Sequence, residues 1–252
     1  MGTRDNLMLE EKGGRISRRM VLRAMARIAA FFSLVPMGTA LGKTFEKRRE
    51  AKMKLPEPKV DGKVSLEKAI RDRRTVRSFS TRHLSLEQVS QLLWAAQGIT
   101  EQGGFKRAAP SAGALYPMDV LVVVGRDAVE HTGPGIYHYE AGSHATILLL
   151  EGDHRDELAR ASLSQFWMAK APVNLVITAE YRRITGKYGE RGERYAMIEA
   201  GHIAQNIFLQ SRAMGLAAGI VGAFTDTEIR HVLHLDAAMD PLLIMPVGYS
   251  KE

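Results

Sequence analysis

Three arginines and a threonine lie within five residues in the first third of the chain. Arg73, Arg74, Thr75 and Arg77 provide three planar guanidinium groups and a hydroxyl, which are donors that proteins commonly use to bind a phosphate group. A solvated basic stretch on the surface is the plainer interpretation of the same residues. We therefore treat this segment as a candidate anion site, with an exposed basic segment as the alternative.

A second segment is rich in small residues and lies between two prolines. It runs through Pro110, Ser111, Ala112 and Gly113 to Pro117, directly before the apolar run DVLVVV. Small residues allow a backbone to approach a flat ligand closely and to present N–H groups and a hydroxyl to it. A tight connection into a buried strand is the plainer interpretation.

A third segment combines two glycines with small apolar residues near the C-terminus. The run GIVGAF covers residues 219–224, with Val221 and Gly222 at its centre. A glycine at this point would allow a backbone N–H to lie directly against a planar heteroaromatic ring. Close packing of a strand on a helix is the alternative.

Lys187 and Tyr188 form the fourth candidate, as a pair for proton transfer. They could exchange a proton with a substrate if burial or neighbouring groups shift their pKa values toward neutrality, although such a charged stretch is more often a solvated loop. The motif EAGHIAQN follows at residues 199–206. Its His202 has only Glu199 within ligand spacing on the same helix face, so we expect no metal site.

An α+β arrangement of elements would have to position these four segments. Helices flank a few apolar strands, and two of the strands are spaced as an antiparallel hairpin, which favours this class. Capping-box patterns begin at Ser85 and Thr225, and Gly215 fits the end of the longest helix. We expect helices at about 66–73, 86–97, 155–168, 194–214 and 226–235, and strands at 119–124, 135–140, 145–150, 172–180 and 242–249.

Composition and charge exclude several classes of protein. The 252 residues are 45% hydrophobic and 25% charged, which is typical of a globular protein, and the absence of cysteine excludes disulfides, thiol nucleophiles and thiolate metal sites. The net charge is +7, but residues 1–42 and 43–54 each carry +4 and residues 55–252 carry −1. Because the main region is nearly neutral, we expect no nucleic-acid partner.

The N-terminal residues have the pattern of an export signal. Arg18 and Arg19 precede an apolar run at 24–41 that Arg27 and Pro36 interrupt, so the run is too short for a comfortable membrane span. The paired arginines resemble the twin-arginine class of signal, and a basic amphipathic helix is the alternative. We expect an export signal at 1–42, a polar linker at 43–63 and the main domain at 64–252. The protein would then be exported, in the periplasm, with membrane contact only through the signal; it would be cytoplasmic if the signal does not function.

Taken in order, the four segments resemble the FMN-dependent nitroreductase superfamily, and within it the SagB-type dehydrogenases. The shared patterns are R-R-[ST]-x-R, P-S-x-G-x-x-x-P, E-A-G-H-x-x-Q-N and G-A-F, and they cover about residues 64–250. The resemblance implies a nitroreductase-like fold with a mainly antiparallel sheet flanked by helices. It also implies a homodimer that holds FMN at the subunit interface.

The resemblance assigns roles to the candidate residues. Arg73, Arg74, Thr75 and Arg77 would contact the phosphate, the ribityl chain and the pyrimidine edge of FMN. Residues 110–113 would approach the flavin from the partner subunit. Val221 and Gly222 would lie beside the isoalloxazine ring, with the Gly222 N–H near N5, and the Lys187–Tyr188 pair is similar to the Lys-Tyr motif of azoline oxidases.

The expected function is therefore that of an FMN-dependent oxidoreductase. A hydride would enter flavin N5 from one substrate and leave to another in ping-pong order. NAD(P)H is scarce outside the cytoplasm, so we expect an organic substrate to be oxidised and electrons to pass to a quinone, another carrier or O2. The alternatives are a SagB-type azoline peptide oxidase, a flavin-binding module without turnover, and a protein that works on a membrane surface through its basic N-terminal part.

Overall fold

A seven-stranded sheet carries the fold in the computed structural model, which describes residues 52–101 and 103–251. The strand order is β1-β4-β3-β2-β5-β7-β6, and every neighbouring pair is antiparallel. The α+β sheet expected from the sequence is therefore confirmed. The strands are β1 (Lys52–Lys54), β2 (Met118–Val124), β3 (Gly135–Glu140), β4 (Ala145–Glu151), β5 (Val173–Ala179), β6 (Ala217–Ala218) and β7 (Asp240–Gly248).

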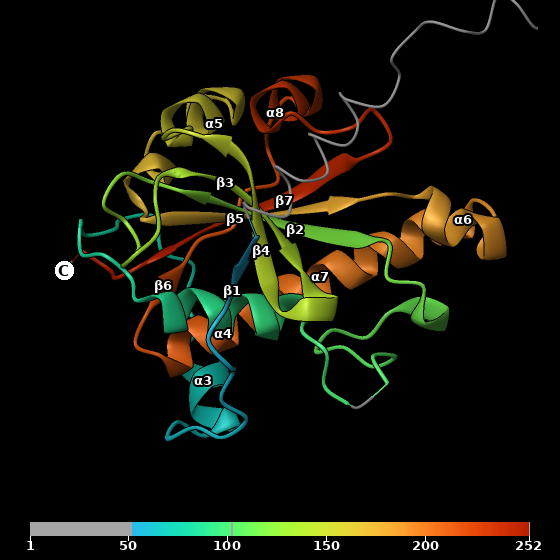
Figure 1. The fold of residues 1–252 in the computed structure, drawn as a ribbon, viewed down its shortest axis with the longest axis horizontal. Helices are drawn as coiled ribbons and strands as arrows, with labels where there is room; N and C mark the ends of the chain where they lie inside the picture. Colours follow the sequence, from blue (N-terminus) through green and yellow to red (C-terminus); the bar gives the residue numbers. More distant parts are fainter. Residues whose placement is uncertain (1–51, 102, 252) are drawn as a thin grey trace, which may run out of the picture. The chain divides into compact units, whose positions relative to one another are not determined.

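Helices cover both faces of the sheet (Figure 1). In the figure α3, α4 and α7 lie on one side of the strands, and α5 and α8 lie on the other. A further short helix, α6, follows the end of β5. The helices are α3 (Leu66–Asp72), α4 (Leu86–Gln97), α5 (Arg155–Ala161), α6 (Arg182–Tyr188), α7 (Arg191–Ala213) and α8 (Asp226–Leu233), with 3-10 turns at Ala112–Ala114, Ala141–Ser143 and Met168–Lys170.

The continuous apolar run of β2 reflects this double covering. Val120 and Val122 belong to the core beneath α4 and α7, whereas Leu121 and Val123 belong to the core beneath α5 and α8. Alternate side chains of a strand point to opposite faces. A strand covered on both faces therefore needs apolar residues at successive positions, and the run VLVVV at 120–124 provides them.

The helix expected at 155–168 is shorter than predicted. It ends at Ala161, because Leu163 and Ser164 adopt left-handed backbone conformations with φ of 54° and 59°. Two such residues in succession cannot continue a right-handed helix. The turn that they form carries Trp167 to Phe79, where the two rings stack with their centres 6.3 Å apart.

Only one of the two expected capping boxes is present. The Ser85 hydroxyl accepts a hydrogen bond from the Gln88 amide, and the Ser85 amide donates one to the Gln88 side-chain oxygen. Thr225 makes no side-chain bond to the start of α8. Its backbone amide donates instead to the Ala161 carbonyl at 2.9 Å, so tertiary packing fixes this residue.

Part of the segment expected to be a polar linker is packed against the sheet. Residues 52–54 form β1 and pair with β4, and Leu55 is buried. Lys59 then exchanges two backbone-to-side-chain hydrogen bonds with Gln91 of α4. The expected export signal and residues 43–51 lie outside the described residues. No helix within the described ranges is both long and apolar enough to cross a bilayer.

Candidate functional site

The arginine-rich and glycine-rich segments predicted from the sequence lie side by side. Thr75 forms a parallel bridge with Ala218, and the Val76 amide donates to the Ala218 carbonyl at 2.9 Å. Gly219 in turn donates to the Pro246 carbonyl of β7 at 2.8 Å. Backbone hydrogen bonds thus attach residues 73–77 and 218–222 to the sheet edge, and we call these two stretches together the arginine cluster.

Gly219 permits this close approach. A Cβ at position 219 would lie 2.8 Å from the Val76 carbonyl oxygen and 2.9 Å from the Trp167 ring. Trp167 also lies 5.8 Å from the guanidinium carbon of Arg77, measured to the ring centre. No local sequence pattern indicates Trp167, because its contacts depend on the turn after α5.

The three arginines carry uncompensated positive charge. The Arg73 guanidinium lies 5.1 Å from the centre of the Phe208 ring, and Arg74 donates to the carbonyls of Arg71 and Arg73 at 2.8 Å each. Within residues 52–101 and 103–251, neither these two arginines nor Arg77 forms an ion pair with a carboxylate. Guanidinium groups in this state are suited to an anionic ligand.

The nearest carboxylate in the sequence is already paired. Asp72 accepts hydrogen bonds from Arg71 at 2.9 Å and from Lys68 at 2.8 Å. These bonds hold the pKa of Asp72 well below its usual range. Asp72 is therefore charged at neutral pH and balances Arg71 and Lys68 rather than the arginine cluster.

Val221 and Gly222 have different environments although they are adjacent. Val221 is buried, and its amide and carbonyl are both bonded to Ile244 of β7 at 2.8 and 2.9 Å. Gly222 is exposed, and its amide donates to no acceptor among the described residues. Unpaired guanidinium groups beside an available backbone N–H fit a planar ligand with an anionic tail, such as FMN.

The other two predicted segments also meet. Gly113 has φ of +63°, and a Cβ at this position would lie 2.7 Å from Tyr188 Oη and 3.0 Å from Lys187 Nζ. The Tyr188 ring packs edge-on against Tyr195, with ring centres 5.2 Å apart. We call residues 110–116 together with Lys187 and Tyr188 the lysine–tyrosine cluster.

A helix rather than a loop positions Lys187 and Tyr188. They are the last two residues of α6, which the buried Ile184 anchors and which Gly189 ends in a left-handed conformation. α7 begins at Arg191, earlier than predicted, and Gly192 in its first turn packs tightly on the backbone of α6. The alternative of a solvated loop was therefore wrong about the loop, although Lys187 is exposed.

The loop that carries residues 110–113 is held by side-chain contacts. The Tyr116 amide donates to Ser111 Oγ at 3.0 Å, and the Arg107 guanidinium carbon lies 4.3 Å from the centre of the Tyr116 ring. Beneath the loop, Gln97 donates to the buried Glu199 carboxylate at 3.0 Å. In the sequence, Glu199 is a candidate only as a metal ligand, and its contacts with this loop have no local sequence signal.

The two clusters lie at opposite ends of α7 within one chain. Arg73 contacts Phe208 near the end of α7, and Tyr188 contacts Tyr195 near its start. Thirteen residues of helix separate these two contacts, which is about 20 Å at the usual rise per residue. The length of β5 gives a second estimate of about 20 Å for the same separation. At one end of β5, Val173 pairs with β7 at the residue that also pairs with Ala218 of the arginine cluster. At the other end, Ala179 pairs with Met118, which follows the loop of the lysine–tyrosine cluster.

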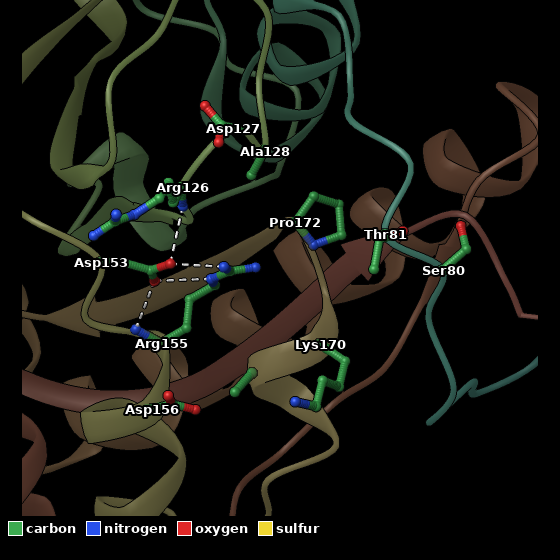
Figure 2. A pocket seen from close by; sticks show the side chains of 11 residues that line it. Ser80, Thr81, Arg126, Asp127, Ala128, Asp153, Arg155, Asp156, Lys170 and Pro172 are labelled. Atoms are coloured by element: carbon green, nitrogen blue, oxygen red, sulfur yellow. Dashed lines mark hydrogen bonds and ion pairs between the residues drawn. The ribbon is translucent and has the colours of Figure 1, made fainter.

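A separate hollow of about 290 Å³ contains none of the predicted residues (Figure 2). Figure 2 shows the Arg155 guanidinium turned toward the Asp153 carboxylate. The two form hydrogen bonds of 2.9 and 2.7 Å, and Arg155 also donates to the Ala171 carbonyl at 2.9 Å. Because these charges satisfy each other, we assign the pair a structural role.

Comparison with known proteins agrees with the geometry. Residues 70–249 match the model described as the nitroreductase family, and the chain belongs to that family. A protein of Methanocaldococcus jannaschii that is named as a nitroreductase is 43% identical over 189 residues, covering 75% of this chain and 93% of that protein. A crystal structure from Ralstonia eutropha, also named as a nitroreductase, has a TM-score of 0.70 and 28% identity, and the match covers 80% of this chain and 90% of that one.

A second relative has a more specific name. The microcin B17-processing protein McbC of Escherichia coli is 29% identical over 171 residues, which is 66% of this chain. The match spans 62% of McbC, less than two thirds of that protein. Fold and sequence together define this protein as a nitroreductase-family oxidoreductase.

Proposed function

We propose that the protein binds FMN and oxidises an organic substrate, passing the electrons to a second carrier in ping-pong order. The observation that carries the proposal is the junction of residues 73–77 with Ala218 and Gly219. It brings three guanidinium groups that form no ion pair with a carboxylate of the described residues to the segment that bears the available amide of Gly222. When bound, FMN supplies a two-electron centre that accepts and donates hydride at N5. The protein's part is to bind, orient and shield that group.

Each residue of the arginine cluster has a role in this proposal. Arg73 and Arg77 would bind the phosphate, while Arg74 and Thr75 would contact the ribityl chain and the pyrimidine edge. Val221, fixed by its two bonds to Ile244, would hold Gly222 beside the ring. The exposed Gly222 N–H would then be the donor nearest to N5.

We further propose that two copies of the chain complete the site. The first half of α7 exposes Met197 and Ile198, which are 57% and 49% accessible, and a Cβ at Gly201, near the middle of the helix, would meet open space. A two-fold axis near this point would exchange the ends of α7. The partner's lysine–tyrosine cluster, with Pro110 and Gly113, would then face the arginine cluster.

The visible spectrum of the purified full-length protein tests FMN binding. We expect bound flavin in the wild type and its loss in Arg73→Ala and Arg77→Ala, because each removes a charge-assisted contact of about 1.5–3 kcal/mol, or about 10- to 150-fold in affinity. Arg126→Ala is the matched control, since Arg126 is exposed and lies outside the arginine cluster. A wild-type protein that remains colourless after incubation with FMN would contradict the proposal.

Azoline oxidation is the second candidate function. Gly113 lies against both Lys187 and Tyr188, which brings two groups capable of proton transfer to a loop proposed to border the flavin. Conversion of a thiazoline to a thiazole removes one hydride and one proton. The bound flavin would accept the hydride, and Lys187 or Tyr188 in its deprotonated form would accept the proton. The similarity to McbC also supports this candidate.

Turnover of a thiazoline-containing peptide tests the second candidate. We expect the product to lack two hydrogens by mass spectrometry, and we expect Lys187→Ala and Tyr188→Phe to reduce the rate by about 10²- to 10⁴-fold. Lys170→Ala is the control, because Lys170 lies in the separate hollow of Figure 2. Full flavin content with no peptide oxidation in the wild type would exclude this candidate and leave the first one standing.

We also propose that the protein is exported through Arg18 and Arg19. An exported enzyme would pass its electrons to a quinone, another carrier or O2 rather than draw them from NAD(P)H. Fractionation of cells that express the wild type and the Arg18→Lys, Arg19→Lys double variant tests this. Equal periplasmic amounts of the two forms would contradict export by this signal.

A further inference from the structure

Glu199 is a buried acid that the proposed chemistry does not use. The residue is only 1% exposed, and one carboxylate oxygen accepts a hydrogen bond from Gln97 at 3.0 Å. The other oxygen, Oε2, is buried with no hydrogen-bond partner among the described residues. A carboxylate in such a position is costly unless nearby groups compensate for it.

The groups around Glu199 form a closed set of contacts. Gln97 also accepts a long hydrogen bond of 3.4 Å from Arg107, and Arg107 lies over the Tyr116 ring. The Tyr116 amide donates to Ser111 Oγ at 3.0 Å. The Ser111 hydroxyl in turn lies near enough to the Glu199 carboxylate to lower its pKa, although no hydrogen bond between the two groups is formed in the structure. Glu199 is therefore connected on both sides to the loop that bears the proposed flavin contacts.

We propose that Glu199 is a positioning residue that controls where the Ser111 hydroxyl points. Ser111 Oγ already accepts from the Tyr116 amide, so its remaining function is to donate one proton. An ionised Glu199 attracts that proton through a charge-assisted bond and turns the hydroxyl inward. A protonated Glu199 releases the hydroxyl, which can then donate to a ligand in front of the loop. The inference rests on the proposed binding of FMN for its functional consequence.

The environment of Glu199 raises the pH at which its carboxyl group loses its proton above the range usual for a glutamate. Burial raises the pKa of Glu199, and the Ser111 hydroxyl and the Gln97 amide act in the opposite direction. The charged or titratable groups that face it are Arg107, from the loop, and His202, from α7 itself. Both favour the ionised form when they are positively charged, and His202 must be controlled for in any titration.

The Tyr116 amide resonance provides a test that does not need flavin. Because this amide donates to Ser111 Oγ, its chemical shift reports the state of the hydroxyl. We expect the shift to titrate in the wild type with a midpoint above 4.5, the ordinary value for glutamate, and to be flat in Glu199→Gln. His202→Gln should keep the titration. A wild-type signal without titration, or one that persists in Glu199→Gln, would overturn the proposal.

FMN affinity measured against pH tests the functional consequence. As Glu199 ionises, the wild-type Kd should rise about 3- to 10-fold, the effect of one hydrogen bond, beyond any change common to all variants. Ionisation of the FMN phosphate affects every variant equally and cancels in the ratio of Kd values. Ser111→Ala and Glu199→Gln should both lack the additional rise, and the double variant should match Ser111→Ala. Ser90→Ala, a buried serine bonded to Pro56 and His144, is the matched control and should keep the wild-type profile.

The two measurements separate failure of this inference from failure of the proposed function. If FMN does not bind but the Tyr116 amide titrates through Glu199, then the proposed function fails and the control of Ser111 stands. If FMN binds and the additional pH dependence is identical in Ser111→Ala and the wild type, then Glu199 does not act through Ser111 and the inference is wrong.

Discussion

The arginine cluster and the lysine–tyrosine cluster are built in different ways. Backbone hydrogen bonds to the sheet edge hold the first, as at Val76 and Gly219. Side chains at a helix end and a left-handed glycine hold the second, as at Lys187 and Gly113. A sheet edge provides a rigid site for binding, whereas a helix end and a loop allow adjustment. The proposed division of work, with binding at one cluster and proton transfer at the other, follows this difference.

Because the two clusters lie far apart within one chain, they can act on the same ligand only if two copies of the chain assemble. The clusters lie about 20 Å apart along α7, by the rise of a helix. A proposed dimer about the middle of α7 would bring the rigid cluster of one copy to the adjustable cluster of the other. Substitutions within each cluster, and at the contact between the copies, therefore test the two clusters separately and together.

Substitution of Ile198 by Asp should have the largest effect, because it would separate the clusters. A charged group in an apolar dimer interface would be buried without a partner. We expect a monomer in light scattering and a loss of flavin affinity of at least about 100-fold. Leu149→Asp is the control, since Leu149 is 41% exposed on β4, away from α7. If the Ile198→Asp protein is dimeric and has its full flavin content, then α7 is not part of the dimer interface and the proposed arrangement is wrong.

Substitution of Gly219 by Ala should damage the arginine cluster alone. The new Cβ would lie within 3.0 Å of both the Val76 carbonyl and the Trp167 ring. Relief of such contacts requires movement of the backbone, and we expect the free energy of unfolding to fall by about 2–3 kcal/mol. Urea unfolding measures the change. Gly186→Ala on α6 is the control, because its Cβ would meet open space, and unchanged stability of Gly219→Ala would contradict the close approach.

The two clusters also differ in how much of them the sequence could predict. The local patterns identified all four segments and the strand DVLVVV, because residue type and spacing determine them. They did not identify Trp167, since its position depends on two left-handed residues after α5 that have no glycine or asparagine signal. They also missed the contacts of Glu199 with Gln97, because a carboxylate is normally exposed and its burial here depends on distant elements.

Substitution of Gly113 by Ala should affect the lysine–tyrosine cluster with a smaller cost in stability. The left-handed conformation costs an alanine about 1–2 kcal/mol, but the atoms nearest to the new Cβ are the flexible ends of Tyr188 and Lys187. We expect the free energy of unfolding to fall by that amount, dimerisation to be kept, and thiazoline oxidation to fall with the displacement of Tyr188. Gly142→Ala is the control. Stability loss equal to that of Gly219→Ala would contradict the contrast between a rigid and an adjustable cluster.

The Asp153–Arg155 pair should contribute to stability without affecting either cluster. Burial acts to raise the pKa of Asp153, but hydrogen bonds from Arg155 and from the Arg126 amide outweigh it and lower the pKa to about 2. A pKa below the usual value of 3.8 means that the folded state favours the ionised carboxylate. The stabilisation is therefore present at neutral pH and is lost as the pH falls through 3.8 toward about 2. Partial exposure reduces its size to about 1 kcal/mol.

Asp153→Asn measures this contribution. At pH 7 the variant should be less stable than the wild type by about 1 kcal/mol in urea unfolding, and the difference should shrink between pH 4 and pH 2 as Asp153 becomes protonated in the wild type. Flavin content should be unchanged at pH 7, because none of the candidate residues lines this hollow. A difference that grows on acidification would reverse the assigned sign. If Asp153→Asn loses both flavin and stability, then the hollow is coupled to the two clusters, and the Asp153–Arg155 pair is not independent of flavin binding.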